Sequence, residues 1–206
     1  MYNLLLKGTG GGINMIHYYF HNMDINQFAF WFFMYSFCGW CMECVVIRRD
    51  LGYWENRGFT KMPFCIIYGV GIFIAYHLFA SIQNNYFALY IAGAIGATIF
   101  EYLTANIMLK LFGEVWWNYE YKKFNYKGVI CLESTLGWGL LSLFIFGFFN
   151  SYIEFFIKSL NHEFVVIIST FLVISYLVDF TYHFTRSVFA RREHQDVVNN
   201  SLNDFV

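Results

Sequence analysis

The sequence predicts an all-α membrane protein, a polytopic helix bundle with about five transmembrane helices. Of its 206 residues, 58% are hydrophobic and only 13% are charged, whereas about a quarter of the residues in a soluble domain are charged. Five apolar stretches approach the roughly 20 residues that a membrane helix needs. The positive charges gather in every second segment that follows one of these stretches, and therefore on one side of the membrane. We therefore expect a multi-pass protein of the cell (plasma) membrane that has the lipid bilayer as its first partner.

Each apolar stretch is bounded by polar or charged residues, and these boundaries set the expected helices. The helices cover residues 27–47, 64–81, 86–109, 129–149 and 164–184. Pro63 precedes the second stretch, where the missing N–H of a first helical turn costs nothing. The expected domains are an extracytoplasmic leader, a five-helix transmembrane domain and a cytoplasmic tail, over residues 1–26, 27–184 and 185–206.

The leader contains no long apolar core followed by a cleavage site, so we expect no cleavable signal peptide. Three glycines, Gly10, Gly11 and Gly12, stand just before Met15. Two interpretations stay open. Either the natural start is Met15 and the glycines are a translated ribosome-binding site, or they belong to a Gly-rich leader.

The distribution of Lys and Arg predicts the orientation of the chain in the bilayer. All of the 13 except Lys7 and Lys158 lie between helices one and two, between helices three and four, or after helix five. Cytoplasmic loops carry an excess of Lys and Arg, so we expect the N-terminus outside and the C-terminus in the cytoplasm. The two cytoplasmic segments, residues 48–62 and 110–128, mix aromatic and charged residues. Each fits a short amphipathic helix on the membrane surface or an irregular loop.

Helices one and two resemble helices three and four in their layout. In each pair the first helix carries a Glu, the following segment ends in Asn-x-Gly or Asn-x-x-Gly, and the second helix carries Gly-x-Gly. The residues are Glu43, Asn56-Arg57-Gly58 and Gly69-x-Gly71 in the first pair, and Glu101, Asn125-x-x-Gly128 and Gly137-x-Gly139 in the second. We interpret this pattern as a parallel two-helix repeat. The glycines also have an explanation that needs no repeat, because small residues allow membrane helices to pack closely.

Four acids lie within the expected helices: Glu43, Glu101, Glu133 and Asp179. An ionised carboxylate in hydrocarbon costs roughly 3 kcal/mol or more, so each needs an explanation. With His183, which shares a helix face with Asp179 at i+4, they form a candidate intramembrane polar site. For Glu43 and Glu133 the alternative is a structural role, because both lie near a helix end. Glu101 lies deepest, about 13 Å from Lys110 by helix rise, which favours a functional role for it.

The sequence offers no chemistry for an enzyme. It contains no P-loop, no nucleophile elbow and no H-E-x-x-H zinc motif, and its net charge of −1 gives no basic field for nucleic acid. Cys38, Cys41 and Cys44 have CxxC spacing within a membrane helix, where buried Cys more often packs as a small hydrophobe than binds a soft metal. We expect no catalytic residue, no metal and no cofactor.

An ordered series of motifs resembles the ABC-transporter type IV permease family (CmpB-like), a group of small bacterial membrane proteins. The resemblance covers about residues 30–145. Met62, Ile66, Asn118 and Val129 depart from the family pattern. The motifs are Gly39-Trp40-x-x-Glu43, Asn56-Arg57-Gly58-Phe59, Pro63, Tyr68-Gly69-x-Gly71, Glu101-Tyr102, Trp116-Trp117-Asn118-Tyr119, Phe124-Asn125-x-x-Gly128, Ile130-Cys131-Leu132-Glu133-Ser134 and Trp138-Gly139.

The resemblance implies a permease-like subunit of an ABC-type transport system, with a separate ABC ATPase as partner. Five helices are few for such a subunit, so a homodimer or a second permease would be needed. The two cytoplasmic segments supply the candidate coupling or lipid contacts, which are Asn56, Arg57, Gly58, Trp116, Trp117, Lys122, Lys123 and Asn125. Two alternatives remain open. One is a stand-alone secondary transporter or channel that uses the intramembrane acids, and the other is an envelope or lipid-binding membrane protein.

Overall fold

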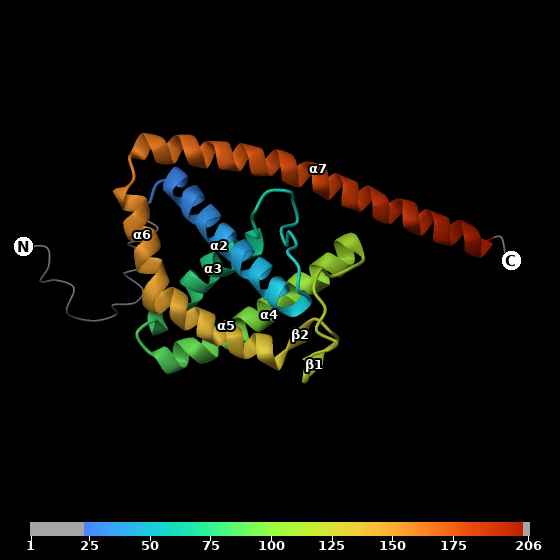
Figure 1. The fold of residues 1–206 in the computed structure, drawn as a ribbon, viewed down its shortest axis with the longest axis horizontal. Helices are drawn as coiled ribbons and strands as arrows, with labels where there is room; N and C mark the ends of the chain where they lie inside the picture. The colour runs from blue at the N-terminus through green and yellow to red at the C-terminus, as the bar shows by residue number, and fades with distance from the viewer. Residues whose placement is uncertain (1–22, 204–206) are drawn as a thin grey trace, which may run out of the picture.

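The structure, a computed structural model, describes residues 23–203. Figure 1 shows a bundle of helices and one helix, α7, that runs past the others toward the C-terminus. The expected leader lies largely outside the described residues, and so does the proposed start at Met15.

Helix α2 (Ile25–Leu51) begins and ends at capping residues that the sequence encodes. Asp24 accepts the backbone N–H of Gln27 and the Gln27 side chain accepts the N–H of Asp24, which forms a capping box. The helix ends at Gly52, whose φ of 83° is the left-handed conformation of a C-terminal cap. It therefore extends beyond the expected apolar stretch and includes Arg48 and Arg49.

The next two helices are joined by a short turn. Helix α3 (Ile66–Phe79) has 14 residues and continues into a 3₁₀ turn, η1 (Ala80–Ile82). Helix α4 (Tyr86–Phe112) is capped by the Asn85 side chain and ends at a left-handed Gly113.

A two-stranded hairpin, β1 (Asn125–Tyr126) and β2 (Ile130–Cys131), leads into the fourth expected helix. This helix is longer than predicted. It runs as α5 (Leu132–Phe144), a π-helix η2 (Ile145–Phe149) and α6 (Asn150–Ser159). The prediction ended it at residue 149 because the polar residues that follow resemble a loop.

Helix α7 (His162–Asn203) is a single helix of 42 residues. It passes along α2 (Figure 1). The expected cytoplasmic tail is thus a continuation of the fifth helix as far as Asn203.

The chain is a multi-pass helical membrane protein. Four helices, α2, α4, α5–α6 and α7, are long and apolar enough to cross a membrane. At about 1.5 Å per residue, the 14 residues of α3 span about 21 Å, less than the roughly 30 Å of the hydrocarbon core. Five crossings and a cytoplasmic C-terminus stay predictions.

The segments that join α2 to α3 and α4 to α5 are irregular, and neither contains the amphipathic helix that the sequence also allowed. Residues 52–65, the first connecting segment, contain no helix or strand. Residues 113–131, the second connecting segment, contain only the β1–β2 hairpin. Their aromatic and charged residues must therefore be judged by the contacts they make.

The helices associate as two pairs, α2 with α3 and α4 with α5, and these pairs share the most extensive interfaces. The repeat that the sequence suggested has counterparts in three dimensions. Both α2 and α4 have 27 residues and end at a glycine with φ of 83°. Cys65 and Cys131 each stand directly before the second helix of a pair. Aromatic and aliphatic side chains from α2, α3, η2, α6 and α7 form the main core.

Candidate functional site

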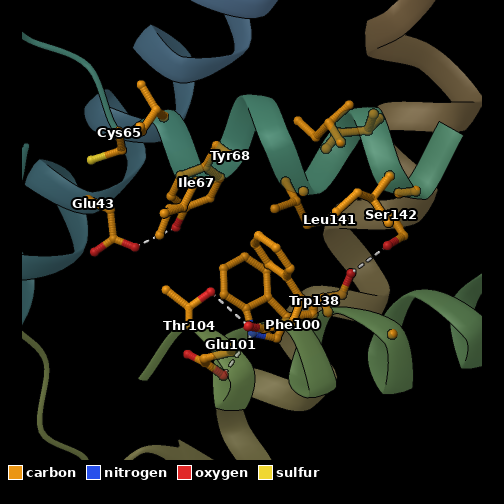
Figure 2. A pocket seen from close by; sticks show the side chains of 18 of the residues that line it. Glu43, Cys65, Ile67, Tyr68, Phe100, Glu101, Thr104, Trp138, Leu141 and Ser142 are labelled. Carbon is orange, nitrogen blue, oxygen red and sulfur yellow. Dashed lines mark hydrogen bonds between the residues drawn. The ribbon is translucent and has the colours of Figure 1, made fainter. Parts of the chain in front are cut away.

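A cavity of about 210 Å³ lies where α3 faces α4 and α5, between the two helix pairs. Most of its lining is aliphatic or aromatic, and its charged members come from α2, α4 and the first connecting segment: Glu43, Glu101 and Arg57. Figure 2 shows Glu43 reaching toward Tyr68 of α3, while Glu101 and Trp138 lie on the opposite wall. The site is therefore an apolar chamber with two carboxylates in its lining.

Glu101, in the interior of α4, is buried and accepts hydrogen bonds on both carboxylate oxygens. The Tyr119 hydroxyl donates to Oε1 at 3.0 Å. Trp138 Nε1 donates to Oε2 at 3.2 Å. The Ser134 hydroxyl lies 3.4 Å from Oε2 and 2.9 Å from the carbonyl oxygen of Cys131, and these two acceptors share its one proton. Among the described residues, these hydrogen-bond donors and no cation within ion-pair distance hold the Glu101 carboxyl group in its apolar surroundings.

Glu43, near the C-terminal end of α2, has a simpler environment. The Tyr68 hydroxyl donates to its Oε1. Tyr68 is buried, and its ring lies directly against Gly39 of α2, where a side chain would leave no room for it. Among the described residues no other donor bonds the Glu43 carboxylate, so Oε2 is available to the cavity.

The two pairs use equivalent positions to hold their acids. Tyr68 and Ser134 each lie three residues after the cysteine that precedes the second helix of a pair. Each has its hydroxyl within hydrogen-bond distance of the glutamate of the first helix, Glu43 or Glu101. The repeated contact supports the interpretation of the two pairs as copies of one unit.

The connecting segments close one end of the cavity and are bonded to each other. Arg57 Nη2 donates to the carbonyl oxygen of Trp116 at 2.7 Å, while Nε, also buried, has no partner among the described residues. The rings of Phe59 and Trp116 stack with centroids 4.9 Å apart. Trp117 Nε1 donates to the Val129 carbonyl at 2.8 Å, which folds the second segment on itself.

The two asparagines of the repeat shape the turns of these segments. Asn56 Oδ1 accepts the N–H of Gly58 at 3.0 Å and Trp40 Nε1 at 2.7 Å. Asn125 Oδ1 accepts the N–H of Gly128 at 3.1 Å. Both asparagines are exposed, and the contacts of their side chains are structural.

Glu133 does not line the cavity. It lies in the first turn of α5, where an acid is favoured by the helix dipole, and Lys122 Nζ is 2.8 Å from its Oε2. Arg49 and Asp50 at the end of α2 complete a network of ion pairs. The hydrogen bond to Glu133 raises the pKa of the Lys122 ammonium. Lys123 is exposed.

Asp179 also lies away from the cavity. Its Oδ2 accepts the backbone N–H of Met62 at 3.0 Å, which attaches the first connecting segment to α7. His183 Nε2 lies 3.3 Å from Asp179 Oδ1, at ion-pair distance but without the alignment of a hydrogen bond. Of the candidate acids, the structure thus brings Glu43 and Glu101 together and separates Glu133 and Asp179 from them.

Sequence reasoning missed the donors that hold the acids. The sequence indicated Tyr68, Tyr119 and Trp138 only as parts of motifs. Burial and the neighbouring Glu101 carboxylate raise the pKa of the Tyr119 hydroxyl, so it remains a donor. Spacing from the cysteines could have indicated Tyr68 and Ser134.

A further buried acid, Glu154 in α6, was also missed. Asn150 Nδ2 donates to Glu154 Oε1 at 2.6 Å, and the Tyr35 hydroxyl donates to Asn150 Oδ1 at 2.9 Å. All three side chains are buried. Asn150 and Glu154 lie in α6, directly after the π-helix η2, an irregularity frequent at functional sites. The prediction had placed Glu154 beyond the membrane helix.

The five described cysteines are free, and within residues 23–203 no group of three or more His, Cys, Asp and Glu could hold a metal ion. Cys44 and Cys65 donate their thiols to the carbonyl oxygens of Glu55 and Arg57. The described lining of the cavity offers a ligand two carboxylates and several aromatic faces.

Fold and site together define a multi-pass helical membrane protein with an acid-lined cavity between two helix pairs. Residues 30–184 match the family described as "Putative ABC-transporter type IV", and the chain belongs to this family. No curated protein and no solved structure matches the chain.

Proposed function

We propose that this protein is the permease-like membrane subunit of an ABC-type transport system of the cell membrane. Family membership supports the transport class. The sequence has no P-loop, so ATP hydrolysis would come from a separate ATPase chain. The substrate would occupy the cavity, because membrane transporters built from repeats bind their substrates at the interface between the repeats.

One observation carries the proposal: both connecting segments are bonded to the cavity lining. Tyr119 of the second segment holds Glu101, and Arg57 of the first segment lines the cavity while binding Trp116 of the second. In the expected orientation these segments face the cytoplasm, where an ATPase would dock. A displacement of either segment would then change the position of a cavity side chain.

The test is purification of the tagged protein from its native host at natural expression level in a gentle detergent, followed by mass spectrometry. We expect a stoichiometric ABC ATPase. A matched pair of variants locates its docking surface. Asn125→Ala disrupts the turn of the second segment and should release the ATPase, whereas Asn106→Ala, within α4, should not. Recovery of the protein only with copies of itself or with lipid would contradict the proposal.

A second candidate function is a stand-alone secondary transporter, favoured by the presence of Glu43 and Glu101 in one cavity. Intramembrane acids are the usual coupling residues of such proteins. Purified protein reconstituted alone in liposomes distinguishes the two functions. Uptake driven by an ion gradient without ATPase, abolished by Glu101→Gln, would establish this second function.

A further inference from the structure

We propose that the cavity binds a small organic monocation, a substituted ammonium with an apolar body. This inference rests on the proposed function for the role of the cavity as the substrate site, and it adds the chemical class of the substrate. Three features carry it: the charge balance of the lining, the free side of Glu43, and the aromatic rings around it.

The charge balance of the lining is negative. Its charged side chains are Glu43, Glu101 and Arg57. With both carboxylates ionised, the single guanidinium leaves one negative charge without a counter-charge, and such a charge in apolar surroundings is costly. Arg57 is moreover directed to the Trp116 carbonyl and lies 3.8 Å from Glu55. A ligand with one positive charge restores neutrality.

The two carboxylates differ in how much of their capacity is already used. Glu101 has three donor groups within hydrogen-bond distance of its two oxygens. Glu43 accepts one, from Tyr68. The cation therefore binds beside Glu43, and Glu101 contributes its charge from the opposite wall of the cavity (Figure 2).

The aromatic lining selects an organic cation over a metal ion. Tyr68 and Trp138 lie with ring centroids 5.9 Å apart, and Phe100, Trp116 and Trp117 also line the cavity. Ring faces attract substituted ammonium groups, which are recognised by aromatic cages. Calcium needs about six to eight oxygen ligands, far more than this lining supplies. A cavity of about 210 Å³ accommodates a small molecule.

The probe is phenyltrimethylammonium, and its control is tert-butylbenzene, which has the same shape with carbon in place of the charged nitrogen. Binding to the full chain in phosphatidylcholine nanodiscs is measured by isothermal titration calorimetry, with empty nanodiscs subtracted. We expect the cation to bind at least tenfold more tightly than the neutral compound. Sodium chloride at equal concentration should not displace it.

Three variants assign the binding to the cavity. Glu43→Gln should weaken the binding of the cation at least tenfold and leave the affinity for the neutral probe unchanged. Glu101→Gln should also weaken the binding of the cation. Glu133→Gln, which removes a carboxylate outside the cavity, is the control and should leave the affinities for both probes unchanged. Circular dichroism of each variant verifies folding.

Equal affinity for the two probes, or unchanged affinity in Glu43→Gln, would overturn the proposal. Displacement of the probe by equimolar sodium would also overturn it. These outcomes leave the association with an ATPase untouched, so the failure of this inference and the failure of the proposed function are distinguishable.

Discussion

The Tyr119 hydroxyl donates to Glu101 Oε1 across 3.0 Å, although one residue lies in a connecting segment and the other in the interior of α4. This contact attaches the second connecting segment to a buried acid of the bundle. Because Glu101 also lines the cavity, the loop and the cavity share one hydrogen-bond network.

Tyr119→Phe should destabilise the protein by about 1–2 kcal/mol, because hydrogen bonds to charged groups contribute more than neutral ones and Ser134 and Trp138 remain as donors to Glu101. The measurement is the apparent melting temperature in detergent. Tyr121→Phe is the control. It removes an exposed hydrogen bond to Asp50, which should contribute little. An equal fall in melting temperature in both variants would show that the hydrogen bond to Glu101 stabilises the protein no more than an exposed one.

Two glycines of α5 should differ in their tolerance of a methyl group. A Cβ on Gly139 would lie 2.7 Å from Cε2 of the Tyr90 ring, whereas a Cβ on Gly137 would meet nothing within 4 Å. Gly139→Ala should therefore cost about 1–3 kcal/mol through overpacking between α4 and α5. Gly137→Ala should be neutral or stabilising, since Ala favours helix by about 1 kcal/mol. Thermal unfolding of both variants in one detergent tests this, and the reverse order would contradict the packing.

Removal of one member of the buried Asn150–Glu154 pair should destabilise the protein more than replacement of both members by apolar residues. Asn150→Leu removes the donor to Glu154 and leaves a buried carboxylate without that partner, at a cost of about 3 kcal/mol or more. The double variant Asn150→Leu/Glu154→Leu replaces both groups with apolar ones and should recover much of the loss. Comparison of the melting temperatures of the single and double variants is the measurement. A double variant less stable than Asn150→Leu would disprove the explanation.

The ion pair of Lys122 with Glu133 should show a defined dependence on pH. The pKa of Lys122 is raised in the folded protein, so its contribution is complete below the unfolded pKa of about 10.4 and is lost as the pH rises through the folded pKa. The difference in melting temperature between the parent and Lys122→Met should be constant from neutral pH upward and shrink above about pH 10.4. A difference that already disappears at neutral pH would exclude this linkage.

The sequence predicted the helices better than their contacts. Apolar length alone located α2 and α4, because a bilayer requires long uncharged stretches. It failed at α6, since Glu154 and Lys158 resemble the polar residues that follow a membrane helix, although Glu154 is buried.

The site was predictable only in part, for a physical reason. The depth of Glu101 in its helix indicated an unusual acid, but its donors stand 18, 33 and 37 residues away along the chain. Those contacts depend on how α5 and the second connecting segment fold against α4, which no local pattern encodes. Glu133, by contrast, is the second residue of α5, where the helix dipole accounts for an acid.

Helix α7 has a consequence for the reach of the molecule. Its 42 residues form a rod of about 63 Å, roughly twice the thickness of the hydrocarbon layer. A large part of the rod must therefore project into water, as one continuous helix with the part inside the lipid. Because α7 is one continuous helix, a rotation of the part that contacts Met62 through Asp179 would also rotate its C-terminal end.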